Sequence, residues 1–335
     1  MKPISKCLLM VICILIVALS GCGKEEPKVY RVGIVYTIDP LVSIADSFKA
    51  KMAELGYIEG ENIAYDVQKT SFEPNEIQQV LKGFVEDKVD LIFAFPTELA
   101  LAAKAATEAT NIPVVFAYST TEGNNLVESV RQPGGNITGV RETGSDIAAK
   151  RLEILHELAP QAKLVYITYK VDAPPAAATV EALQKASSLM NITLVKAPVT
   201  TIEEMKARLQ EQAALDDLGM DAILLLSEPI CASPAGTEAI SRFAAKHKVP
   251  MGGIGKYSVH EEWGAKAIIF SYEVYLDDIG KLAATLADKI LKGTPAGTIP
   301  VVTPEAKLLI NYKVAQELGL TVPEGLLARA DEIIR

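Results

Sequence analysis

From residue 29 onward, short apolar runs alternate with longer stretches in which apolar residues recur every three or four positions. The short runs are rich in Val, Ile, Phe and Tyr and have the length of strands. The longer stretches have the period of amphipathic helices. This alternation is typical of βαβ units and parallel sheets. The pattern therefore predicts an α/β fold.

The predicted elements fall into two consecutive sets. The first set has strands at 30–36, 63–69, 91–95 and 114–118, with helices at 43–55, 75–86 and 97–109. The second set has strands at 164–169, 194–199 and 223–227, with helices at 175–189, 202–215 and 235–247. Two sets of this kind predict two Rossmann-like lobes.

Turn-forming segments mark where the chain passes between the lobes. A Pro-Gly-Gly turn and a short strand within 131–140 suggest the first passage, and a strand at 267–270 with the helix after it is interpreted as returning to lobe one. A segment at 293–304, punctuated by Pro and Gly, precedes a last strand and helix at 308–318 that cross back. We therefore predict lobe one at 29–140 plus about 266–300, lobe two at 141–265 plus about 301–335, and hinges near 138–141, 264–267 and 300–303.

The N-terminus has the form of an export signal. Lys2 and Lys6 precede an apolar stretch at 7–19 that is shorter than the roughly 18 residues a membrane span requires. Leu-Ser-Gly-Cys follows and resembles a bacterial lipobox, with Cys22 as the acylated residue. We expect a signal peptide at 1–21, a lipid-anchored tether at 22–28 and an extracytoplasmic location; the alternative is an anchor helix with an incidental cysteine.

Charge and cysteine content narrow the function further. The formal net charge is −9, and removing the two lysines of the signal lowers it to −11. Such a charge argues against nucleic-acid binding and against a polybasic membrane surface. After processing and acylation only Cys231 remains, so no intramolecular disulfide is expected.

Several segments resemble a known protein family. The most specific is Leu-Val-Glu-Ser at 126–129 running into Pro-Gly-Gly-Asn-Ile-Thr-Gly-Val at 133–140. Further similar segments lie at 55–62, 96–104, 112–116, 150–155, 280–292 and 311–320. On these residues the chain resembles the substrate-binding proteins of ABC transporters whose known members bind tryptophan or tyrosine.

The resemblance implies the type I periplasmic-binding-protein, or Venus flytrap, architecture. It implies a small-molecule ligand, most simply an aromatic or aliphatic amino acid, the permease and ATPase of an importer as partners, and no cofactor. We expect a monomer that contacts the membrane only through lipid. The alternative is a sensor lipoprotein that presents its closed form to a receptor kinase. Phe95 and the segment 118–123 depart from the family pattern, so the ligand can differ.

Ligand contacts are expected where strands end, because ligands of open α/β sheets bind beyond the carboxyl ends of the strands. The candidates are Tyr36, Thr37, Phe95, Pro96, Thr97, Tyr118, Ser119 and Thr120 in lobe one, and Tyr169, Asp172, Ser227, Glu228 and Tyr257 in lobe two. Thr97, Ser119 and Thr120 are candidates for the carboxylate of an amino acid, and Asp172 or Glu228 for its ammonium. Each has a structural alternative: Thr97 as a helix cap, the aromatic residues as core packing and Glu228 as a solvated loop acid.

Signals of catalysis are missing from the sequence. There is no Gly-x-Ser-x-Gly nucleophile motif and no phosphate-binding loop, and the glycines at 252–255 lack the spacing of a dinucleotide site. His156, His247 and His260 lie far apart without metal-ligand spacing, and Cys231 has no CxxC partner. We therefore expect a binding protein without enzymatic activity and without a metal site.

Overall fold

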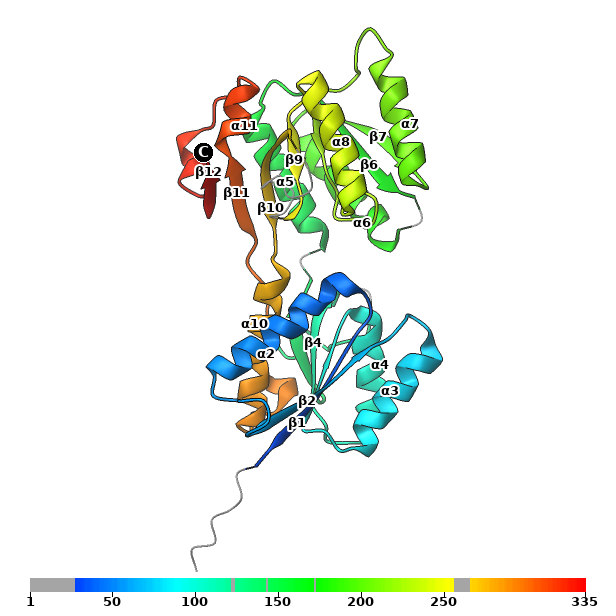
Figure 1. Cartoon of the computed structure of the whole chain (residues 1–335), viewed down its shortest axis with the longest axis vertical. Helices are drawn as coiled ribbons and strands as arrows, with labels where there is room; N and C mark the ends of the chain where they lie inside the picture. The colour runs from blue at the N-terminus through cyan, green and yellow to red at the C-terminus, as the bar shows by residue number, and fades with distance from the viewer. Residues whose placement is uncertain (1–27, 122–123, 143, 172, 256–265) are drawn as a thin grey trace, which may run out of the picture.

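Two lobes, each built around its own sheet, are joined at a narrow waist (Figure 1). This computed structural model describes residues 28–121, 124–142, 144–171, 173–255 and 266–335. The first sheet has five strands in the order β2-β1-β3-β4-β5, all parallel, and the second has seven in the order β12-β11-β10-β9-β8-β6-β7. In the second sheet only the β10–β11 pairing is antiparallel. The predicted α/β fold with two Rossmann-like lobes is confirmed.

Lobe one contains the N-terminal strands and a helix from late in the chain. Its strands are β1 (Tyr30–Tyr36), β2 (Ile63–Lys69), β3 (Leu91–Ala94), β4 (Val114–Ser119) and β5 (Ile137–Arg141). Its helices are η1 (Asp39–Leu41), α2 (Val42–Glu54), α3 (Pro74–Glu86), α4 (Thr97–Thr107), α10 (Leu276–Leu291) and η2 (Ala296–Thr298). The ranges predicted for the first set of strands and helices agree with the structure to within two residues.

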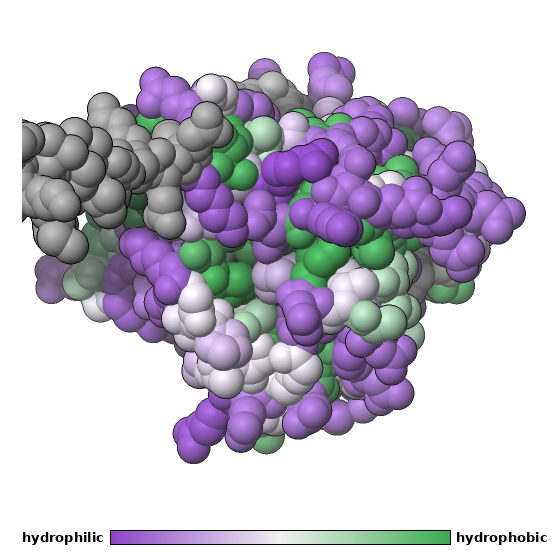
Figure 2. All heavy atoms as spheres, turned by 90° about the horizontal axis from the view of Figure 1, so that it is seen from below, coloured by the Kyte–Doolittle hydropathy of each residue, from purple (hydrophilic) through white to green (hydrophobic). Residues whose placement is uncertain are grey.

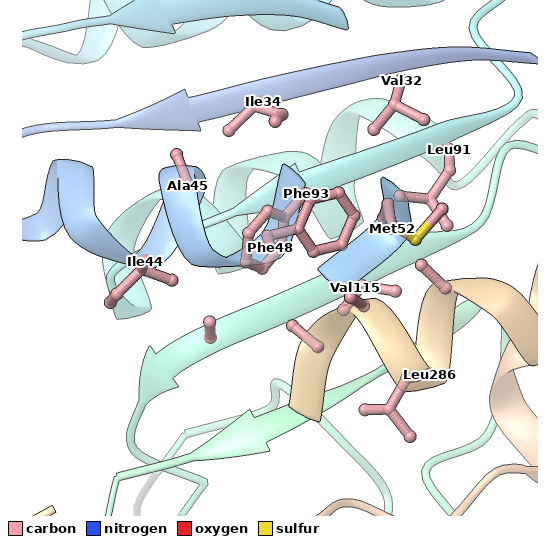
Figure 3. Packing of buried hydrophobic residues seen from close by; sticks show 14 of the residues in the cluster. Val32, Ile34, Ile44, Ala45, Phe48, Met52, Leu91, Phe93, Val115 and Leu286 are labelled. Carbon is pink, nitrogen blue, oxygen red and sulfur yellow. The ribbon is translucent and has the colours of Figure 1, made fainter. Parts of the chain in front are cut away.

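The core of lobe one is rich in aromatic residues. Phe48 of α2 stacks on Phe93 of β3 with ring centroids 4.4 Å apart, between the sheet and the helices α2 and α10 (Figure 3). At Gly280 of α10 a Cβ would overlap Ser47 Oγ and the Ile44 carbonyl oxygen of α2, so the glycine allows the two helices to approach closely. A separate cluster fills the opposite face of the sheet beneath α3 and α4.

Lobe two combines the middle of the chain with its C-terminal end. Its strands are β6 (Leu164–Lys170), β7 (Thr193–Val199), β8 (Ala222–Leu224), β9 (Met251–Gly253), β10 (Ile268–Glu273), β11 (Lys307–Asn311) and β12 (Glu332–Ile334). Its helices are α5 (Gly144–Leu158), α6 (Pro174–Leu189), α7 (Ile202–Ala213), α8 (Pro234–His247), α11 (Tyr312–Glu317) and α12 (Glu324–Leu327). Mostly aliphatic clusters fill both faces of this sheet.

The prediction for the second passage between lobes was wrong. We expected the strand after residue 266 to return to lobe one, but β10 pairs with β9 and β11 in the second sheet. The chain therefore crosses after Glu273, and only α10 belongs to lobe one. A strand followed by an amphipathic helix has the same sequence pattern whether or not the helix packs on the strand's own sheet.

The other two passages lie slightly later than predicted. Residues 137–141 form β5 of the first sheet, so the first crossing lies at 142–144. Val302 N donates to Gly139 O at 2.9 Å, which keeps Val302 with lobe one. Since β11 begins at Lys307, the third crossing lies at 303–306. The three crossings are thus 142–144, 274–275 and 303–306.

The end of lobe one farthest from lobe two presents mainly hydrophilic side chains, with smaller hydrophobic areas between them (Figure 2). Over the described ranges, the helices are too short or too polar to cross a membrane.

Candidate functional site

A small cavity lies at the waist, where the crossings meet. Its lining residues are Tyr118, Glu142, Gly144, Ile147, Arg151, Ser227, Glu273, Val274, Ile279 and Pro304. They come from both lobes and from all three crossings. The volume of about 40 Å³ accommodates water but not a solute, for which pockets of about 300–1,000 Å³ are usual. A solute bound at the waist would therefore have to extend beyond this cavity.

Arg151 of α5 forms the lobe-two wall of this cavity. Its Nη1 donates to the Leu225 carbonyl oxygen at 3.0 Å, and its Nη2 donates to Ser227 Oγ at 2.7 Å and to Glu273 Oε2 at 3.1 Å. The side chain is only 3 % exposed, and its Nε is a buried donor without an acceptor among the described residues. Burial lowers the pKa of Arg151, while the charge of Glu273 opposes that shift.

Two carboxylates face the cavity from two different crossings. Glu273 ends β10, and its Oε2 accepts from Arg151 and from Ser227 Oγ at 3.0 Å. Glu142 directly follows β5, and its backbone N–H donates to the Ser119 carbonyl oxygen at 2.8 Å. Burial raises the pKa of Glu142, and the negative charges of Glu273 and then Glu98 raise it further. Among the described residues, the Glu142 carboxylate has neither a hydrogen-bond donor nor a cationic partner.

Tyr118 reaches the cavity because the end of β4 is irregular. The register between β4 and β5 shifts between Phe116 and Ser119, and Tyr118 adopts the left-handed conformation with φ of 47°. Non-glycine residues seldom adopt this conformation, and where they do it is often at functional sites. Burial and the charges of Glu142 and Glu273 raise the pKa of the Tyr118 phenol, so it remains a neutral hydroxyl. It contributes both an aromatic ring and a hydrogen-bonding group.

The other predicted aromatic residues of lobe one pack against each other. Tyr36 stacks on Phe95 with centroids 5.9 Å apart, and Phe95 is completely buried. Thr37 is buried as well, and its Oγ1 has no partner within the described part of the chain. Pro96 follows a cis peptide bond and caps α4. These residues form the edge of lobe one beside the cavity, and none of them lines it.

The predicted hydroxyl groups of lobe one differ in whether their hydrogen is still available to bond a ligand. Thr120 N donates to Thr97 Oγ1 at 3.1 Å, which places the start of α4 beside the end of β4 and leaves the Thr97 hydroxyl hydrogen available. Asn124 Nδ2 donates to the Thr120 carbonyl oxygen at 3.0 Å and fixes this loop. Ser119 is buried, and its Oγ donates to the Ala117 carbonyl oxygen at 2.8 Å. Its hydroxyl hydrogen is therefore already in use.

Of the residues predicted for the lobe-two side of the site, one lines the cavity and others have structural roles. Ser227 lines the cavity, whereas Tyr169 is partly buried against the lobe-two core. Glu228 is 4 % exposed and accepts from the backbone N–H groups of Lys170 at 2.9 Å and Cys231 at 2.6 Å. Its carboxylate holds the loop after β8 in place. Asp172 and Tyr257, like Cys22 near the N-terminus, lie outside the described residues.

Sequence reasoning missed the charged residues that line the cavity: Glu142, Arg151 and Glu273. Glu142 directly follows the strand β5, so the rule that selected the other candidates applies to it as well. Glu273 ends β10 and lies three residues beyond the predicted end of that strand at residue 270. Arg151 was detectable too. Its neighbours at helical spacing, including Ala148 and Leu155, are apolar and buried, and an arginine on such a face is exceptional.

Comparisons with known proteins agree with this architecture. The family described as ABC transporter substrate binding protein matches residues 31–334. A curated relative, named tyrosine-binding protein, comes from Clostridioides difficile strain R20291; it is 29 % identical over 323 residues, covering 90 % of this chain and 88 % of that protein.

Solved structures show the same fold. A conserved domain protein from Vibrio cholerae is 27 % identical with a TM-score of 0.70, covering 91 % of this chain and 100 % of the other. An ABC domain in complex with L-Trp from Streptococcus pneumonia is 24 % identical with a TM-score of 0.70, covering 92 % and 100 %. A ligand-free, open substrate-binding protein with adhesive properties from Clostridium difficile is 24 % identical with a TM-score of 0.72, covering 91 % and 99 %.

Proposed function

The chain belongs to the family of ABC transporter substrate-binding proteins, and we propose that it binds an amino acid between its lobes and delivers it to the permease and ATPase of an importer. Proteins of this family work outside the cytoplasm and bind solutes without catalysing a reaction. The waist cavity carries the proposal. Because its lining comes from both lobes and every crossing, a solute bound there favours one relative position of the lobes, which is how hinged binding proteins report occupancy.

An amino acid is the solute class that the polar groups of the cleft support best. The free amides at the start of α4 and the hydroxyl of Thr97 are suited to a carboxylate. The crossings supply negative charge for an ammonium, and the ring of Tyr118 supplies an apolar surface for a side chain. The tyrosine-binding relative supports the same class.

Membrane attachment through Cys22 completes the proposal. An acylated Cys22 would leave a tether of a few polar residues before β1, which begins at Tyr30. Metabolic labelling with a fatty-acid analogue should mark the wild-type protein and leave Cys22→Ala unmarked. Equal labelling of both would contradict the anchor at this residue.

Thermal unfolding of the purified protein against amino acids, aromatic metabolites, nucleosides and sugars tests the solute class. A solute at 100 times its Kd stabilises the folded state by about 2.7 kcal/mol. We expect a shift with an amino acid and a smaller radius of gyration in solution scattering when that amino acid saturates the protein. A shift with sugars alone would overturn the amino-acid proposal, and binding without uptake by importer-containing vesicles would favour a receptor-kinase sensor instead.

A further inference from the structure

We propose that Glu142, together with Glu273, binds the cationic group of the solute, so that a protonated amine is required for tight binding. This inference rests on the proposed function, because it specifies one end of the solute in the same cleft. The ammonium partner is then found beside the crossings, and not at Asp172 or Glu228, which were the candidates predicted for that role. Glu142 also becomes a determinant of specificity.

The charges that line the cavity do not balance. Glu142 and Glu273 carry two negative charges, and Arg151 is the only cation among the lining residues. Arg151 is committed to Glu273 at 3.1 Å, which leaves Glu142 without a counter-charge among the described residues. Lys150, which directly precedes Arg151, does not pair with Glu142 either, because its Nζ lies 2.7 Å from Glu153 Oε2. A single cation in the cleft would restore neutrality.

Because Glu142 is largely buried, its unpaired negative charge affects binding more than the charge of a surface acid would. A carboxylate removed from water is unfavourable until a cation approaches it, and charges attract more strongly in a site with low dielectric constant. A primary ammonium supplies a positive charge and three donors, which Glu142 lacks among the described residues. An uncharged sugar hydroxyl supplies a donor without the charge.

Arg151 provides independent support for a missing polar ligand. Its side chain is almost completely buried, lines the same cavity and keeps an Nε donor that has no acceptor in the part of the chain that the structure describes. A buried donor without a partner loses its hydrogen bond to water and gains none in return, which is unfavourable. The polar lining is therefore incomplete on both the donor and the acceptor side, as expected for a site that is completed by a zwitterion or by water held beside it.

The position of the two acids couples the cation to the hinge. Glu142 begins the first crossing and Glu273 immediately precedes the second. The negative charge of Glu273 adds to burial in raising the pKa of Glu142, so the two carboxylates interact unfavourably. Without a cation the two carboxylates repel each other across the waist. An ammonium between them reverses that interaction, so cation binding favours the arrangement in which the two crossings are closest.

Glu142→Gln is a suitable test variant. Gln keeps the shape and removes the unfavourable buried charge, and the Glu142 side chain has no partner among the described residues that the change would orphan. The variant should therefore fold. Glu98→Gln is the matched control: Glu98 is an exposed acid whose charge also raises the pKa of Glu142, but it does not line the cavity.

Isothermal titration would compare L-tyrosine with tyramine, which keeps the amine, and with 3-(4-hydroxyphenyl)propionate, which lacks it. L-tryptophan, tryptamine and indole-3-propionate form a second series. We expect Glu142→Gln to weaken binding of the amino acid about 10- to 100-fold and binding of the des-amino acid by less than about 3-fold. Glu98→Gln should change neither by more than about 3-fold.

The outcomes separate the two proposals. If the wild type binds an amino acid and Glu142→Gln binds it equally well, or if the wild type binds the des-amino acid as tightly as the amino acid, the cation site is wrong while the proposed function stands. If no amino acid of the wider panel binds, the proposed function fails and this inference fails with it. Stabilisation by inorganic cations alone, without any amine, would also overturn the requirement for an ammonium.

Discussion

The edge of lobe one and the crossings both lie at the waist, but they differ in charge and in hydrogen bonding. At the edge of lobe one, Tyr36 and Phe95 stack on each other and the hydroxyl of Ser119 bonds within its own strand. At the crossings, Glu142 and Glu273 face a buried arginine with incomplete hydrogen bonding. The edge of lobe one is neutral and closely packed, although the buried Thr37 hydroxyl has no partner among the described residues, whereas the crossings carry buried charge.

This difference separates residues that shape the cleft from residues that select its solute. A packed aromatic edge gives a rigid border that presents no charge to a solute. A charged region with unmet interactions gains free energy only when a complementary group arrives. Residues of the first kind should affect stability when altered, and residues of the second kind should affect affinity.

Phe95→Ala tests the neutral edge and should have the largest effect on stability. Removing a fully buried phenylalanine leaves a cavity between Tyr36 and Phe93, so the free energy of unfolding should fall by about 3–5 kcal/mol. Urea denaturation measures the change. Phe72→Ala, at a residue 52 % exposed, should stay within about 0.5 kcal/mol. A loss of similar size in both variants would contradict the packing role.

Arg151→Ala breaks the charged region and should cost nearly as much. It leaves Glu273, Ser227 and the Leu225 carbonyl oxygen without their shared donor. Breaking a buried ion pair costs about 3–5 kcal/mol, and because Glu273 is 24 % exposed we expect about 3 kcal/mol or slightly less. Arg208→Ala, which removes an exposed pair with Glu204, should cost only about 0.3–0.5 kcal/mol. An Arg151 variant as stable as the Arg208 variant would show that the buried network contributes nothing.

Glu228→Gln sharpens the comparison between a structural acid and a ligand-binding acid. The carboxylate accepts two backbone N–H groups, and an amide offers only one oxygen for them. We expect a loss of about 1–3 kcal/mol in unfolding free energy with no change in the Kd for the amino acid. Glu142→Gln should show the reverse pattern. Weakened binding by Glu228→Gln at unchanged stability would restore Glu228 as the ammonium partner.

The regular elements were largely predictable because apolar periodicity is a local property of the chain. β1 and β2 were predicted with their observed ends, and most other elements to within two residues. The short strand β9 was missed because Met251–Gly253 has too few apolar residues to produce a pattern. The assignment of β10 to a lobe was wrong because sheet membership depends on distant partners, here β9 and β11.

The site was less predictable than the fold for a related reason. Position after a strand selected Tyr118 and Ser227, which line the waist cavity, but it does not reveal whether a side chain already has a partner. Glu228 resembled a binding acid in sequence, yet backbone amides occupy its carboxylate. Glu142 and Glu273 matter because two crossings far apart in the sequence meet at the waist, and only the tertiary structure shows that meeting.

The smallest expected effect is a pH dependence of stability that originates at Glu142. Burial and the nearby acids raise the pKa of Glu142 above its ordinary value of 4.5, so the folded protein holds this proton more tightly than the unfolded chain does. The resulting contribution to stability is fully present below pH 4.5 and is lost as the pH rises through the raised pKa. Glu142→Gln carries no such proton, so its stability relative to wild type should increase across that window and then level off.

Urea denaturation at half-unit pH steps, with Glu98→Gln as the control, measures the difference. A constant difference between wild type and Glu142→Gln at every pH would show that Glu142 is as well solvated as an ordinary surface acid. The contrast between the charged crossings and the neutral edge of lobe one would then lose its electrostatic basis.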